Sequence, residues 1–191
     1  MSLTRSAPRL AAIATAVSTA ALLAACSTMQ SPASTFSQAS LPAPIQVPAG
    51  HKVAWETVGS GDITYECRDK ANAAGETEWD FVGPKAVLKD RSGKAVGSYY
   101  GPPATWEAND GSKRAATQLA VAPSGAGNLP YQLVKANPAM GSGALTGVSH
   151  IQRVALRGGV APADKPCTSA TKGQKAVVQY QADYIFWKPM M

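Results

Sequence analysis

The sequence has few of the side chains that usually carry out chemistry. Its 191 residues include two histidines, His51 and His150, and three cysteines, Cys26, Cys67 and Cys167. C-x-x-C and H-E-x-x-H patterns are absent, so the usual spacing of zinc ligands is missing. G-x-G-x-x-G, P-loop and G-x-S-x-G patterns are also absent. We therefore predict no metal site and no cofactor.

Long apolar runs and concentrated positive charge are missing as well. The main apolar run, residues 10–23, is shorter than the roughly 20 residues that cross a bilayer. The formal net charge is +6, from 18 basic and 12 acidic residues, and the basic residues do not cluster beyond the neighbours Lys113 and Arg114. Nucleic-acid binding requires a concentrated basic face, so we predict no nucleic-acid partner.

The first 26 residues have the pattern of a secretory signal. Arg5 and Arg9 precede the short apolar run, and small residues follow it. The exit "LAAC", which ends at Cys26, resembles the bacterial lipobox, a signal cut just before a cysteine that then carries lipid. We therefore expect residues 1–25 to be a lipoprotein signal peptide and Cys26 to be the lipid attachment site. The alternative is an ordinary signal peptide, with Cys26 removed or incidental.

The lipobox interpretation predicts a location in the cell envelope. The membrane would then be a partner through the lipid anchor. Ser27 replaces the aspartate of an inner-membrane retention signal, which favours the outer membrane, on its periplasmic or surface side. Residues 26–46 are rich in Ser, Pro, Ala and Gln and are predicted to be a flexible tether. Residues 47–191 are predicted to form a single β domain.

Alternation of apolar and polar residues predicts an all-β fold with little helix. The clearest case is the segment from Ala176 to Trp187, where every second residue is apolar. "GSG" at residues 59–61 and Gly83-Pro84 are expected to be turns between short strands. About nine such strands predict a single antiparallel β-sandwich or barrel. The expected core comprises Trp55, Tyr65, Trp79, Leu88, Leu119, Ile151, Tyr184 and Phe186.

Two cysteines would remain beside Cys26 in the processed chain. In an oxidising compartment such a pair usually forms a disulfide, so a Cys67–Cys167 bridge is predicted. It would close a loop of about 100 residues, for which the chain-entropy treatment gives up to roughly 4–5 kcal/mol. Two buried free thiols, or a zinc site completed by His51 and His150, are the alternatives.

Several landmarks in order resemble a known family. They are "GDITYEC", "PKAVLKDRSGKAVG", "GPPATWEANDGS", "GALTGVSHIQRVALRGGVAP" and "YQADYIFW". The family is domain of unknown function 3455, found in bacteria and fungi, and the resemblance covers about residues 41–187. The paired cysteines Cys67 and Cys167 fit its pattern. The sequence departs from it by about one extra residue in "GPPATW" and by His150 in place of an aromatic. The resemblance implies no established activity.

Four residues are candidates for a binding or reactive site. Trp106 would offer a flat apolar face beside Asp110, whereas the alternative places Trp106 in the core and Asp110 in a turn. Arg153 would bind an anion or a substrate carboxylate through a bidentate contact, or else pair with a structural carboxylate or with backbone carbonyls. His150 is the histidine available for a Ser-His-acid arrangement within the domain.

The sequence favours a non-catalytic envelope lipoprotein over an enzyme. Its β domain would bind a small-molecule, glycan or protein ligand. The alternative is a secreted hydrolase of unrecognised type, with a polar cleft near Trp106, Asp110, His150 and Arg153. A structure can distinguish the two hypotheses, because only the hydrolase requires His150 and an acid to meet in an open pocket.

Overall fold

The computed structural model describes Met1 and residues 36–190. The predicted signal peptide, the lipid attachment site Cys26 and the first part of the predicted tether lie outside the described residues. In the part that the structure describes, no helix is long and apolar enough to cross a bilayer.

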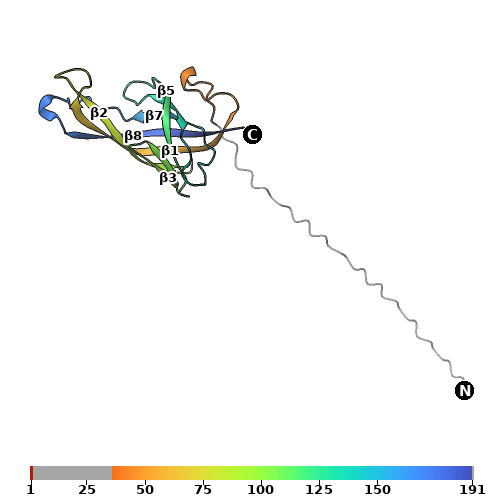
Figure 1. The fold of residues 1–191 in the computed structure, drawn as a ribbon. Coiled ribbons are helices and arrows are strands. Elements are labelled where there is room, and N and C mark those ends of the chain that lie inside the picture. Colours follow the sequence, from red (N-terminus) through yellow and green to blue (C-terminus); the bar gives the residue numbers. More distant parts are fainter. Residues whose placement is uncertain (2–35, 191) are drawn as a thin grey trace. The chain divides into compact units, whose positions relative to one another are not determined.

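Eight antiparallel strands close into a barrel in which each strand pairs with its neighbours in the sequence, and β8 pairs with β1 (Figure 1). This confirms the predicted all-β antiparallel fold. Within residues 36–190, helix is limited to two short 3-10 turns, η1 (Ala43–Ile45) and η2 (Ser169–Thr171). The strands are β1 (His51–Asp69), β2 (Thr77–Lys89), β3 (Ala95–Tyr100), β4 (Thr105–Ala108), β5 (Lys113–Ala122), β6 (Tyr131–Ala136), β7 (His150–Gly158) and β8 (Lys175–Pro189).

Two expected turns are instead the interiors of long strands. β1 continues through "GSG" at residues 59–61, and β2 continues through Gly83-Pro84. The glycines serve close packing rather than chain reversal. A Cβ on Gly59 would collide with the ring of Tyr184, and a Cβ on Gly61 would collide with the backbone of Lys85. The eight strands are completed by β4 and β6, which the alternation of the sequence did not identify.

Aromatic rings fill the barrel interior. Tyr99 stacks on Trp106 with ring centroids 4.6 Å apart, and Tyr184 lies 5.0 Å from Tyr99 and 5.7 Å from Trp106. Most of the predicted core is confirmed, and Trp55 and Trp79 pack against it while half-buried. The prediction is wrong for Leu119, which is 52% exposed. A bulge between Gln118 and Ala120 shifts the register of β5 at this residue.

A segment before β1 packs on the outside of the barrel. This strap, Phe36–Val47, buries Ile45 and Val47 against outward side chains of β5 to β8, including Leu133, Val154 and Ile185. Burying a side chain of this size contributes roughly 1.5–3 kcal/mol. The predicted tether, which ended at Gln46, is therefore wrong for residues 36–46.

A buried amide holds the strap in place. Gln152 in β7 is fully buried and donates from its Nε2 to Oε1 of Gln38 (3.0 Å) and to the carbonyl of Ile45 (2.7 Å). Its Oε1 accepts a hydrogen bond of 2.8 Å from Nε1 of Trp187. Gln38 also pairs with both backbone polar groups of Val47. An unsatisfied buried amide would cost about 1–3 kcal/mol. The strap supplies hydrogen-bond partners for Gln152 and so stabilises the outer face of β7 and β8.

Candidate functional site

The antiparallel order of the strands gives the barrel two distinct ends. The basic end is formed by residues 90–94, 109–112 and 137–149, with the start of β1 and the end of β8. The disulfide end is formed by residues 70–76, 101–104, 123–130 and 159–174. The candidate residues are distributed between these two ends and the interior.

Asp110 lies in a tight turn at the basic end. Its Oδ1 accepts hydrogen bonds from the backbone N–H (3.0 Å) and the hydroxyl (2.6 Å) of Ser112. Its Oδ2 accepts from the backbone N–H of Ala144 at 2.7 Å. The hydroxyl of Ser112, followed by these backbone N–H groups, holds the pKa of Asp110 below its ordinary value. Asp110 is thus an anchor for the loop that contains Ala144.

That loop, residues 141–148, covers the basic end of the barrel and is called the plug loop below. Leu145 is fully buried in the interior core, and its backbone N–H donates to the hydroxyl of Ser112 at 3.2 Å. Arg114 is buried beneath the loop and donates to the carbonyls of Leu145 (3.0 Å) and Asn137 (2.7 Å). Burial lowers the pKa of Arg114. The loop and the turn around Asp110 therefore form one closed structure.

Trp106 is part of the interior core and offers no face to a ligand. Its side chain is only 2% exposed, beneath Tyr99 and Tyr184. The interpretation of Trp106 as a flat surface platform is therefore wrong. Its Nε1 and the hydroxyl of Thr57 are buried polar atoms without a hydrogen-bond partner among the described residues.

His150 lies at the rim of the basic end, beside the other histidine of the chain. The His51 and His150 rings meet edge to face with centroids 4.8 Å apart, which is the contact of an aromatic pair. Nδ1 of His150 is 3.1 Å from the hydroxyl of Ser149. Burial, followed by the nearby His51 and Lys135, lowers the pKa of His150. Within residues 36–190 no carboxylate is paired with His150, so a His–acid couple is not formed.

Arg153 is buried among the tyrosines of the interior. It donates to the carbonyl of Pro130 from Nε (3.3 Å) and from Nη2 (3.0 Å). Burial raises the pKa of Tyr65 and Tyr184, and the positive charge of Arg153 opposes part of this rise. Its contacts match the structural alternative, in which the arginine pairs with backbone carbonyls.

The four candidates do not form one cleft. Trp106 and Arg153 lie in the interior, whereas Asp110 and His150 lie at the basic end in separate hydrogen-bond networks. Among the contacts of the described residues, no hydrogen bond, ion pair or ring contact joins any two of the four. The expected polar cleft near all four residues is therefore wrong.

The predicted disulfide is confirmed at the opposite end. Cys67 near the end of β1 is bonded to Cys167, with the two Cα atoms 5.4 Å apart. The bridge holds residues 160–174 over the inner face of β1 and β2. There the indole Nε1 of Trp79 donates to the carbonyl of Lys165 at 2.7 Å, and the hydroxyl of Thr77 donates to the carbonyl of Cys167 at 3.0 Å.

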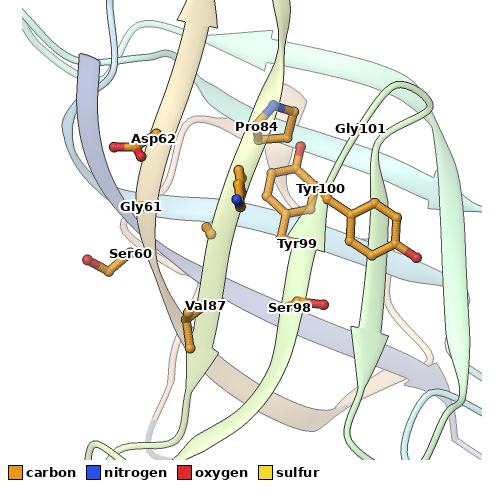
Figure 2. Close-up of a pocket in the computed structure, with 11 residues that line it drawn as sticks. Ser60, Gly61, Asp62, Pro84, Val87, Ser98, Tyr99, Tyr100 and Gly101 are labelled. Carbon is orange, nitrogen blue, oxygen red and sulfur yellow. The ribbon is translucent and has the colours of Figure 1, made fainter. Parts of the chain in front are cut away.

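A groove that the sequence analysis did not identify crosses the surface of β1, β2 and β3 (Figure 2). Its volume is about 680 Å³, and most of its lining is apolar. Tyr100 is 37% exposed and Val87 is 44% exposed. In Figure 2, Tyr100 lies on one side of β2, and Ser60 and Asp62 lie on the other side. The lining residues are Ser60, Gly61, Asp62, Pro84, Lys85, Ala86, Val87, Ser98, Tyr99, Tyr100 and Gly101.

Polar contacts fix the Tyr100 side of the groove. The hydroxyl of Tyr100 donates to Oε2 of Glu107 at 2.8 Å, and the same oxygen is 3.1 Å from Nζ of Lys113. The Tyr100 hydroxyl and the Lys113 ammonium hold the pKa of Glu107 below its ordinary value. The sequence does contain a signal for this site: "YY" at residues 99–100 lies in a strand, so one ring must face outward when the other enters the core.

The chain was compared with known proteins. No curated protein and no solved structure matches it. Residues 48–188, nearly all of the barrel, match the family described as protein of unknown function (DUF3455), so the chain belongs to that family.

Proposed function

We propose that the protein is a cell-envelope lipoprotein, anchored through Cys26, whose barrel binds a glycan without catalysing a reaction. The groove on β1 to β3 carries this proposal. Ligand sites combine a mostly apolar concave surface with a few fixed polar groups. Here Tyr100 and Val87 supply the apolar surface, and Ser98 and Asp62 supply hydroxyl and carboxylate groups.

A glycan fits this lining better than a purely apolar ligand. A sugar ring has apolar C–H faces and a polar edge, so it can lie on an aromatic ring while its hydroxyls bind polar side chains. Tyr100 is held by its hydrogen bond to Glu107, which reduces the conformational entropy lost on binding. Lys85 and Asp62 lie opposite each other on β2 and β1, so the groove contains one side chain of each charge. This favours a polar ligand over one of high net charge.

Hydrolysis has no comparable support. The alternative required His150 and an acid to share an open pocket. His150 instead contacts Ser149 and His51. The Asp110 carboxylate accepts hydrogen bonds from Ser112 and Ala144.

The ligand proposal is tested with purified peptidoglycan fragments as the probe, because peptidoglycan is an envelope glycan. Replacing Tyr100 by Ala should weaken binding about tenfold, the loss expected for one aromatic contact. Leu119→Ala, an exposed apolar change on β5, is the matched control and should bind as the wild type does. Absence of binding to the wild type, or equal losses in both variants, would reject the glycan proposal.

The anchor is tested separately by cell fractionation. Cys26→Ser should move the protein from the membrane fraction to the soluble fraction. A serine variant that still sediments with membranes in high salt would show that the attachment has another cause.

A further inference from the structure

The basic end carries a group of cationic side chains on its rim. Lys52 in β1 lies directly opposite Lys188 in β8, and Lys135 in β6 lies opposite His150 in β7. The ring of His51 packs against that of His150. Four neighbouring strands, β6, β7, β8 and β1, thus carry a lysine or a histidine at this end of the barrel.

These lysines have no acidic partner within residues 36–190. None of the ion pairs there includes Lys52, Lys135 or Lys188. Lys52 and Lys135 are exposed, and Lys188 is half-buried. Like charges directly opposite each other destabilise a sheet, so the Lys52–Lys188 pair works against folding. An external anion would relieve this repulsion.

The strap begins beside the same rim. The ring of Phe36 contacts Trp187 edge to face, with centroids 6.2 Å apart, and Trp187 is the β8 partner of His150. In Figure 1 the strap and the C-terminal end of β8 lie at the same end of the barrel. Cys26 precedes Phe36 by ten residues in the sequence. Ten residues span at most about 35 Å when fully extended, and about 17 Å as a random coil.

We propose that the basic end faces the membrane and binds anionic phospholipid headgroups through Lys52, Lys135 and Lys188. The inference rests on the proposed lipid attachment at Cys26, because a short connection brings this rim, rather than the disulfide end, to the bilayer. Surface potentials act within a Debye length, about 8 Å at physiological ionic strength. A lipid chain combined with a basic patch also holds a protein at a membrane more firmly than the lipid chain alone.

An acidic protein would also complement the rim, but the proposed anchor would not hold such a protein there. The lipid surface is favoured because the anchor already confines this end of the barrel near phosphate groups. Each lysine near an anionic surface contributes about 1 kcal/mol, which corresponds to roughly fivefold in affinity. Three lysines together should therefore contribute on the order of 100-fold.

The experiment uses the full-length Cys26→Ser chain, which carries no lipid. Binding is measured to phosphatidylcholine vesicles with and without phosphatidylglycerol. The test variant combines Lys52→Gln, Lys135→Gln and Lys188→Gln. The matched control combines Lys165→Gln, Lys172→Gln and Lys175→Gln, which changes the net charge equally at the disulfide end. Residues 1–25 are common to both variants, so any binding through them cancels in the comparison.

The expected result is a preference for phosphatidylglycerol that falls on the order of 100-fold in the basic-end variant, and little in the control. High salt should abolish the same preference in the parent chain. Equal losses in both variants, or no preference for phosphatidylglycerol in the parent, would overturn the proposal. Such a failure is distinct from failure of the anchor, which is read from the fractionation of the Cys26→Ser protein in cells.

Discussion

The two ends of the barrel are closed in different ways. At the disulfide end a covalent bond holds residues 160–174 across β1 and β2, and nearby surface charges are paired, as in Arg68–Asp80 and Lys70–Glu76. At the basic end the backbone N–H of Leu145 donates to the hydroxyl of Ser112, and Arg114 donates to the carbonyl of Leu145. The rim lysines there have no acidic partner in the described part of the chain. Arg91 at the basic end is also paired, with Glu56 and Asp183, so the two ends differ in the covalent bond of one and in the rim lysines of the other.

The largest expected effect is the loss of the bridge at the disulfide end. Cys67→Ser removes a crosslink with a sequence separation of 100. The unfolded chain then gains conformational entropy, and the free energy of unfolding should fall by about 4–5 kcal/mol in a urea titration. Cys167→Ser is the matched variant and should lose the same amount. Unchanged stability in both variants would contradict this.

A smaller loss is expected from the plug of the basic end. Leu145→Ala leaves a cavity under the loop and should lower the free energy of unfolding by about 3 kcal/mol, measured in the same way. Leu119→Ala is the control, since that side chain is half exposed and its loss should change stability by less than about 0.5 kcal/mol. A Leu145 variant as stable as the Leu119 variant would show that the plug contributes little to closing this end.

The smallest expected effect is a pH dependence confined to the basic end. The pKa of His150 is lowered from its usual 6.5 in the folded protein, so the unfolded chain takes up this proton first. The contribution of His150 to stability is full above about pH 6.5 and is lost as the pH falls below it. His150→Phe keeps a ring against His51 and should have a shallower fall in melting temperature between about pH 7 and pH 5.5. Parallel curves for wild type and variant would refute this.

Sequence alternation predicted the inner face of the barrel well, and its failures have physical causes. Tyr180, Tyr184 and Phe186 face the core as predicted from β8. The same pattern missed that Ile185 and Trp187 on the opposite face are also buried, because the strap that covers them comes from a polar, proline-containing segment. Strand periodicity contains no information about such a covering segment.

Glycine was the other source of error in the fold. Gly59 and Gly61 were expected in a turn, but the tertiary structure uses them to admit Tyr184 and the β2 backbone close to β1. A glycine in a turn and a glycine beneath a closely packed neighbour both lack a side chain. The sequence does not distinguish the two cases, because the position of the packed neighbour is set by the tertiary structure. The disulfide, by contrast, was predicted from the cysteine count together with the oxidising compartment that the lipobox resemblance implies.

The candidate site was less predictable than the fold. Trp106 and Tyr100 are both aromatic residues of the same hairpin, yet Trp106 enters the core and Tyr100 lines the groove. Which of the two faces outward depends on the register between β3 and β4, where Trp106 pairs with Tyr99. His51 and His150 meet because β1 and β7 both begin at the same end, a consequence of barrel closure.

The strap also determines how a pulling force would enter the barrel. Tension on the chain before Phe36 must first break the pairing of Gln38 with Val47 and Gln152 before it reaches β1. β1 pairs with β8 over residues 51–66 and with β2 over residues 58–69, so many hydrogen bonds would then bear the load together. We therefore expect the hydrogen bonds of Gln38 and Gln152 to break before the barrel unfolds.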